Sequence, residues 1–135
     1  MQPTRSIAYA WRGNFSIEAR NRLHAEAFNQ RLLSDDWGAQ VSRHSLGWVC
    51  ATVDNTLVGF VNVAWDGAVH AFVLDTIVAS THRGLGIATR MLALCASEAR
   101  KARCEWLHVD FEEHLCPLYF ESAGFTPTRA GLIKL

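Results

Sequence analysis

A ten-residue segment, ASTHRGLGIA at residues 79–88, holds residue types suited to binding a phosphate. Its two glycines, Gly84 and Gly86, allow backbone conformations and close approaches that a side chain would block. The segment leads into a helical pattern, and the first N–H groups and partial positive charge of a helix can hold a pyrophosphate. Arg83 can place a guanidinium beside that anion. The alternative is that the glycines only ease a turn from strand to helix.

Two common nucleotide-binding motifs do not match this segment. The P-loop pattern GxxxxGK[ST] is absent from the sequence, and Thr89 stands where the Rossmann pattern GxGxxG needs its third glycine. These mismatches disfavour an NAD- or ATP-binding protein of either class.

Three polar side chains on predicted strands are candidates for proton transfer. Asp75 is the one charged residue of VHAFVLDTIVA, residues 69–79, where burying a carboxylate without a partner is costly. We therefore consider Asp75 a candidate general base, and the alternative is a pairing with an arginine or with backbone N–H groups. His108 and Asp110 share one face of a strand with Trp106. One interpretation is that His108 and Asp110 relay a proton or line an acceptor pocket. The alternative is that they are ordinary polar residues near the end of a strand.

The other histidines and the cysteines give weaker signals. His70 follows the Asp66-Gly67 turn and is expected to be exposed. The cysteines show no CxxC pair and no metal-like spacing with histidine, which predicts free thiols in a reducing compartment and no metal site. The cysteines are Cys50, Cys95, Cys104 and Cys116, and the histidines expected to be surface or satisfied core residues are His24, His44 and His114.

Composition narrows the class of protein. A chain of 135 residues, half of them hydrophobic, suits one globular domain. Thirteen Lys and Arg balance thirteen Asp and Glu, which disfavours nucleic acid as a partner. No apolar run approaches the roughly 18 residues of a membrane helix. No signal-peptide pattern is visible, so we expect a cytoplasmic protein without a membrane partner.

The apolar periodicity predicts an α/β (α+β) domain with the element order α-α-β-β-β-α-β-α-β. Hairpins come first, because turn sequences separate the early strands, and β-α-β crossovers with parallel pairing follow. Ser34 and Thr81 are expected to cap helices. The predicted helices span residues 16–29, 35–43, 81–101 and 116–123, and the predicted strands span 48–53, 56–65, 69–79, 105–111 and 129–135.

Residues 83–88, RGLGIA, match the form RxxGxA of the Q/RxxGxG/A signature and resemble GNAT-type N-acetyltransferases. The resemblance extends to the order of elements over residues 15–135. It includes LYFESAGF at residues 118–125, which is similar to the late helix of that family ending in Gly-Phe. The resemblance implies a GNAT-like mixed, partly antiparallel sheet flanked by helices, and a single N-acetyltransferase domain over residues 1–135.

The resemblance also implies acetyl-CoA, or another acyl-CoA, bound where the strands at 69–79 and 105–111 separate. The N–H group of Ile77 or Val78 would polarise the thioester carbonyl. Backbone groups that would pair with the pantetheine arm belong to Thr76, Ile77 and Val78. Backbone amides that would hold the pyrophosphate belong to Arg83, Gly84, Leu85, Gly86, Ile87 and Ala88.

The chain departs from the family at its usual proton donor. A tyrosine that commonly protonates the leaving thiolate falls on Phe120, which has no hydroxyl. Tyr119 is adjacent, but one helical residue turns a side chain by about 100°. A frequent asparagine of the family falls on Glu113. Tyr119 is therefore a candidate acid whose orientation the sequence leaves open.

The expected function is transfer of an acetyl group from acetyl-CoA to a primary amine by direct attack in a ternary complex. The acceptor, a small molecule or a peptide, is not identified by the sequence. The alternative is an acyl-CoA-binding GNAT fold that acts as a sensor or partner module with little catalysis, which Phe120 favours. A homodimer is also plausible for this family, and the predicted strand at 129–135 is a candidate for pairing across its interface.

Overall fold

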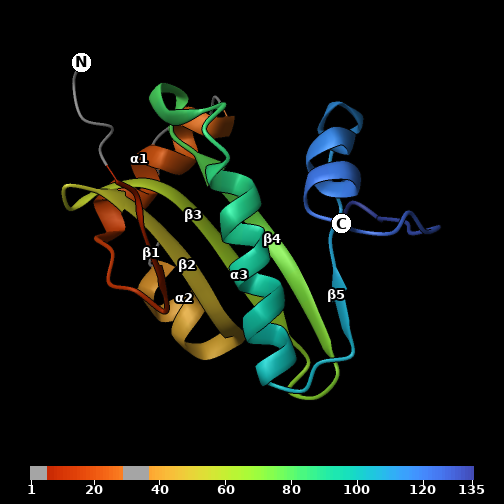
Figure 1. Cartoon of the computed structure of the whole chain (residues 1–135). Helices are drawn as coiled ribbons and strands as arrows, with labels where there is room; N and C mark the ends of the chain where they lie inside the picture. The colour runs from red at the N-terminus through yellow and green to blue at the C-terminus, as the bar shows by residue number, and fades with distance from the viewer. Residues whose placement is uncertain (1–5, 29–36) are drawn as a thin grey trace.

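The computed structural model describes residues 6–28 and 37–135, and these form a five-stranded sheet with helices on both faces (Figure 1). The strands lie in the order β1-β2-β3-β4-β5, antiparallel from β1 to β4 and parallel between β4 and β5. The strands are β1 (Ala8–Trp11), β2 (Ser45–Val53), β3 (Thr56–Trp65), β4 (His70–Val78) and β5 (Trp106–His108). The helices are α1 (Ile17–Phe28), α2 (Trp37–His44) and α3 (Ile87–Lys101), with the short turns η1 (Ser80–His82) and η2 (Glu113–Leu115) and the π-helical η3 (Pro117–Ser122).

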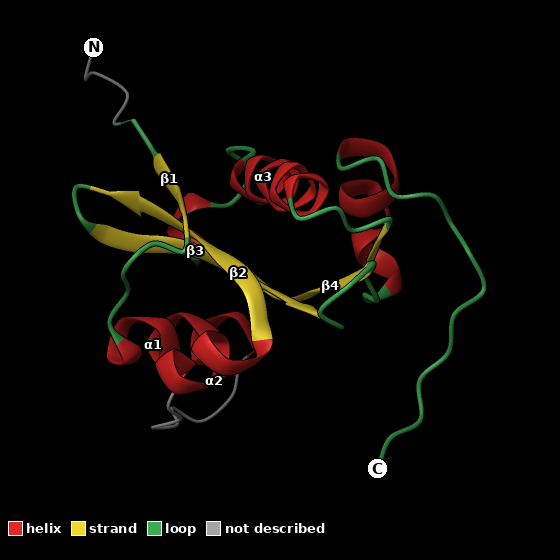
Figure 2. Cartoon of the chain, turned by 90° about the horizontal axis from the view of Figure 1, so that it is seen from below, coloured by secondary structure: helices red, strands yellow, loops and turns green. Residues whose placement is uncertain are grey.

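Each face of the sheet carries its own core. Figure 2 shows α1 and α2 on one face and α3 on the other. Because successive side chains of a strand point to opposite faces, β2 and β3 contribute to both cores. Val49, Val61, Val63, Met91 and Leu92 belong to the buried cluster beneath α3. Leu23, Val41, Trp48, Cys50, Phe60 and Ile77 belong to the cluster beneath α1 and α2.

A β-bulge in β4 interrupts the regular alternation. Phe60 pairs with Ile77 and Asn62 pairs with Leu74, so β4 contains one residue more than β3 between these pairs. Asp75 lies in the bulge with a φ of 55°, in the left-handed region that aspartate tolerates better than most residues. The bulge bends β4 and changes which side chains face each core.

β4 and β5 pair only at their beginnings. Their register joins His70 to Trp106, Ala71 to Leu107 and Phe72 to His108. Figure 1 shows the two strands diverging beyond these residues. The backbone edge of β4 from Val73 onward therefore has no strand partner on the β5 side.

The mixed sheet flanked by helices is confirmed, but several predicted elements are corrected. An additional strand, β1, pairs with β2, although its four residues were too few for a visible periodicity. Thr81 does not cap the long helix, because α3 begins at Ile87 after a loop that contains η1. The strand predicted at 105–111 is shorter, and Asp110 lies beyond its end. Ser34 lies outside the described residues.

The C-terminal end of the chain also differs from the prediction. The late helix predicted at 116–123 is present as the π-helical η3, and the short turn η2 precedes it. The strand predicted at 129–135 is wrong, because these residues form no secondary structure and are exposed. Leu132, Ile133 and Leu135 are among the exposed large hydrophobic residues. A β-prone segment becomes a strand only where an edge accepts its hydrogen bonds, and these residues meet none in the structure.

Candidate active site

The loop between β4 and α3 encloses a hollow beside the beginning of the helix. Gly84 and Gly86 have φ angles of 78° and 79°, which explains why the loop needs glycine at these positions. Gly86 is the N-cap of α3 and supplies no side-chain hydrogen bond, so its first turn retains N–H groups that can bind an anion. The hollow has a volume of about 230 Å³. Its lining comprises Val78, His82, Arg83, Gly84, Gly86, Ile87, Ala88, Thr89 and Leu118.

Most of the residues predicted to bind the cofactor line this hollow, and three do not. Leu85 is 62% exposed, Ile77 is buried in the core beneath α1 and α2, and Thr76 lies outside the lining. His82 lines the hollow, and its Nδ1 lies 2.8 Å from the hydroxyl of Thr81. The sequence analysis missed His82, although it stands directly before Arg83 in the glycine-rich segment.

The last residues of β4 expose backbone groups at the open edge of the strand. The Ala79 N–H donates to the Val58 carbonyl of β3 at 2.8 Å. Because backbone groups of successive strand residues point to opposite edges, the groups of Val78 point away from β3. Arg83 supports this orientation, since its Nε donates a long hydrogen bond of 3.4 Å to the Val78 carbonyl. Of the two residues expected to polarise a thioester, Val78 is the one that faces the open edge.

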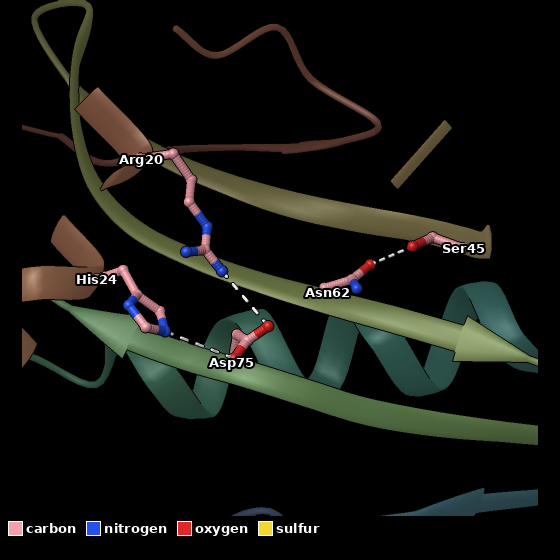
Figure 3. A network of polar contacts seen from close by, with 5 residues as sticks. All are labelled: Arg20, His24, Ser45, Asn62 and Asp75. Carbon is pink, nitrogen blue, oxygen red and sulfur yellow. Dashed lines mark hydrogen bonds and ion pairs between the residues drawn. The ribbon is translucent and has the colours of Figure 1, made fainter. Parts of the chain in front are cut away.

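Asp75 faces two basic side chains from α1, Arg20 and His24 (Figure 3). Arg20 Nη2 lies 3.4 Å from Asp75 Oδ2, and His24 Nε2 lies 3.9 Å from Asp75 Oδ1. Arg20 is fully buried, and its guanidinium also lies 4.9 Å from the centre of the Phe60 ring. A buried guanidinium needs an anionic partner, so the pairing of Asp75 with an arginine is the arrangement that the structure shows. The sequence analysis did not single out Arg20 and expected no role for His24.

A second polar contact joins the half-buried Ser45 of β2 to the buried Asn62 of β3. Ser45 donates a hydrogen bond to Oδ1 of Asn62, which is 3% exposed and pairs across the sheet with Leu74 (Figure 3). This bond satisfies a buried amide next to the bulge and thereby supports the position of β4.

Tyr119, on η3, belongs to the buried cluster beneath α3. It is 4% exposed, stacks on Phe111 at 4.4 Å and meets the edge of Phe125 at 5.8 Å. Burial raises the pKa of the Tyr119 hydroxyl, and the charge of Asp110 adds to this, while the Thr76 side chain partly counteracts it. Tyr119 therefore stays protonated at neutral pH. It occupies the inward position that the sequence analysis left open, next to Phe120.

Thr76 carries a polar atom that lacks an ordinary partner. Its Oγ1 is buried and forms no hydrogen bond of good geometry, although the side chain is near enough to Tyr119 to affect the pKa of that hydroxyl. A buried hydroxyl without a partner is costly, and a ligand beside β4 would supply one.

His108 and Asp110 are not brought together by the strand on which they were predicted. The His108 ring stacks on Phe72 at 4.7 Å, and its Nε2 lies 2.8 Å from Nδ1 of His70. Asp110 follows the end of β5 and acts electrostatically on Tyr119. A proton relay that involves His108 and Asp110 remains a prediction.

The described part of the chain forms no metal-binding cluster, and two of its cysteines, Cys50 and Cys95, are deeply buried. No group of three or more His, Cys, Asp or Glu residues is placed to hold a metal ion there. No helix among residues 6–28 and 37–135 is long and apolar enough to cross a membrane.

All four cysteines are free. Burial raises the pKa of the Cys50 thiol to about 11 and that of Cys95 to about 12, so both thiols are unreactive at neutral pH.

Comparison with protein families decides the assignment of this fold. The model of the acetyltransferase (GNAT) family matches residues 8–125. The chain belongs to the GNAT acetyltransferase family. The predicted resemblance and enzyme class are thereby confirmed. Enzymes of this family use acetyl-CoA and acetylate amines.

Solved structures resemble this GNAT chain in fold at low sequence identity. A GNAT-family acetyltransferase from Streptococcus pneumoniae has a TM-score of 0.76 and 20% identity, covering 96% of this chain and 98% of that chain. Glucosamine-6-phosphate N-acetyltransferase from Arabidopsis thaliana has a TM-score of 0.72 and 10% identity, with coverages of 95% and 98%. An aminoglycoside N-acetyltransferase in complex with CoA has a TM-score of 0.77 and 14% identity, with coverages of 100% and 97%. No curated protein matches the sequence significantly.

Proposed function

We propose that this chain is a single GNAT domain over residues 1–135 that transfers an acetyl group from acetyl-CoA to a primary amine of a small molecule or peptide. The hollow at the beginning of α3, beside the separation of β4 from β5, carries this proposal. In the reaction the amine nitrogen bonds to the thioester carbonyl carbon and the C–S bond breaks. The amine loses a proton to a base, and the leaving thiolate gains one from an acid.

The donor fits the residues that line the cleft. Backbone amides from Arg83 to Ala88 would bind the pyrophosphate at the helix N-terminus, and the Arg83 guanidinium would add a positive charge. Thr76, Ile77 and Val78 form the strand segment beside which the pantetheine arm would lie, and the buried Thr76 hydroxyl would gain a partner there. Val78 would donate its N–H to the thioester oxygen, because its backbone faces the open edge of β4.

Two side chains supply the proton transfers in this proposal. Tyr119 is the acid, because its buried hydroxyl stays protonated and lies next to the Thr76 side chain of β4. Asp75 is the base, held in the bulge of β4 by Arg20 and His24. His108 and Asp110 would contribute separately, His108 to the acceptor surface and Asp110 through its charge near Tyr119.

The alternative of a non-catalytic CoA-binding module is less favoured by the structure. Its support was the replacement of the usual tyrosine by Phe120. A buried tyrosine hydroxyl is present one residue earlier, next to Thr76 of β4, and would serve as the proton donor.

Titration calorimetry with acetyl-CoA, CoA and NAD in parallel, followed by CoA release with a panel of amines, tests the proposal. We expect saturable binding of acetyl-CoA and CoA, no binding of NAD, and CoA release that requires an amine. Binding without release for any amine would favour the non-catalytic module. Absence of binding to both CoA species would contradict the placement of the donor site.

A further inference from the structure

Exposed aromatic and apolar side chains gather on one face of β4 and β5. Phe72 and Leu74 are each 39% exposed, and Trp106 is 63% exposed. Ala71 and Val73, which flank Phe72 on β4, are buried in the core beneath α3. Because side chains alternate along a strand, Phe72 and Leu74 point to the opposite face, which α1 and α2 cover farther along the sheet. Figure 2 shows β4 extending beyond these two helices.

Four ring side chains share this face, and we call them the ring platform: His70, Phe72, Trp106 and His108. The strand register places His70 opposite Trp106 and Phe72 opposite His108. The rings of Phe72 and His108 stack with an interplanar angle of 17°, and a hydrogen bond of 2.8 Å joins His108 to His70. Contacts among His70, Phe72 and His108 thus hold three of the four rings against one another without a ligand.

The ring platform ends where the pairing of β4 with β5 ends. Phe72 and His108 are the last paired residues, and Leu74 and Asp75 follow along β4 toward the proposed donor site. Three strand residues at about 3.3 Å each place Phe72 roughly 10 Å from Asp75. A short chain with a ring at one end and an amine at the other spans this distance.

We propose that the ring platform binds the acceptor, and that the acceptor is a primary amine joined by a short chain to an aromatic ring or a similarly flat apolar body. Aromatic side chains stack with flat rings and attract an ammonium group to their faces. The platform residues and Leu74 carry no permanent positive charge, so they offer no ion pair to a carboxylate or phosphate on the acceptor. This inference rests on the proposed acetyltransferase function and names its substrate class.

Binding of two amines to the protein, with and without saturating CoA, tests the platform directly. The probes are 2-phenylethylamine and n-butylamine, measured by titration calorimetry. We expect 2-phenylethylamine to bind roughly tenfold more tightly than n-butylamine. Phe72→Leu removes the ring and keeps apolar area, so it should abolish most of this preference. The matched variant Phe72→Tyr keeps the ring and should retain the preference.

Equal binding of the two amines, or an unchanged preference in Phe72→Leu, would overturn the inference. Sedimentation velocity of both variants adds a second criterion, because dissociation of a wild-type dimer by Phe72→Leu would make this face an interface between copies. CoA release separates the two proposals. Ring-dependent binding without acetylation contradicts the enzymatic function alone, whereas acetylation of alkyl amines without a preference for rings contradicts the platform alone.

Discussion

At the scale of the residue, the structure assigns different surroundings to the two candidates for proton transfer. Tyr119 is enclosed by aromatic rings and stays protonated because burial raises its pKa. Asp75 is partly exposed and faces the positive charge of the buried Arg20. A buried hydroxyl that keeps its proton and a partly exposed carboxylate paired with a guanidinium suit opposite steps of one reaction.

Tyr119→Phe tests the acid. We expect kcat to fall by about 100-fold, because general acid catalysis contributes that order of magnitude. Acetyl-CoA affinity should change little, since the ring remains in place. The other tyrosine, Tyr9, lies on β1 with Arg90 over its ring, and Tyr9→Phe is the matched control. Steady-state rates of the two variants provide the measurement. An unchanged kcat in Tyr119→Phe would exclude Tyr119 as the general acid.

Asp75→Asn tests the base while preserving a residue type that accepts a positive φ. We expect turnover to fall and the free energy of unfolding to decrease by about 1–3 kcal/mol, because the buried Arg20 loses its anionic partner. The double variant Arg20→Met/Asp75→Asn removes both charges. Denaturant unfolding should show part of the stability restored in it, and rate measurements should show turnover still low. Recovery of turnover together with stability would reduce Asp75 to an ion-pair partner.

At the scale of the element, the loop between β4 and α3 is suited to anions by its backbone. Gly86 caps α3 in the left-handed region, and no protein atom lies within 4 Å of the position that a Cβ would take. The bulge acts on the other side of the cleft. It turns β4 so that Asp75 meets α1 while Val78 keeps its backbone at the open edge.

Gly86→Ala separates backbone strain from ligand contact. Alanine at a φ of 79° costs about 1 kcal/mol, and its methyl group projects beside the hollow. Gly67→Ala is the matched control, because Gly67 has a φ of 82° and equally open space but lies in the β3–β4 turn. We expect both variants to lose similar stability by thermal unfolding. Calorimetry should show a loss of acetyl-CoA affinity of about tenfold or more in Gly86→Ala alone. Equal acetyl-CoA affinities of the two variants would contradict the proposal that the loop binds the donor.

At the scale of the whole molecule, two buried thiols and one buried tyrosine hydroxyl make the free energy of unfolding depend on pH in the alkaline range. The pKa values of Cys50 and Cys95 are about 11 and about 12 in the folded protein, against 9.0 for an ordinary thiol, and that of Tyr119 is also raised. Their contribution to stability is complete below pH 9. As the pH rises above 9, the unfolded chain releases these protons first, so the folded state loses its advantage.

Urea unfolding at several pH values checks this expectation. We expect the free energy of unfolding to decrease between about pH 9 and pH 10.5. The double variant Cys50→Ala/Cys95→Ala should be less stable at neutral pH, because two buried side chains are shortened, but its stability should depend less on pH over this range. Equal slopes for the wild type and the double variant would contradict the assignment to these thiols.

Local sequence signals were sufficient for much of the domain. The hairpins, the helix after residue 86 and the glycine-rich loop were recognisable because turn residues, helical periodicity and glycine act over a few neighbouring residues. β1 and the irregular end of the chain were not, since a short edge strand is defined by the partner it meets. The π-helical turn of η3 likewise hid which of Tyr119 and Phe120 faces inward.

The sequence by itself determined the family resemblance, the glycine-rich loop before α3 and the residue types available for catalysis. Tertiary structure alone decided that Arg20 meets Asp75, that Tyr119 is the buried ring, and that His70 and His108 join Phe72 and Trp106 on one face. The physical reason is the register of the sheet. One extra residue in β4 and three paired residues between β4 and β5 bring together side chains that are 30 or more positions apart, and no local pattern encodes such a pairing.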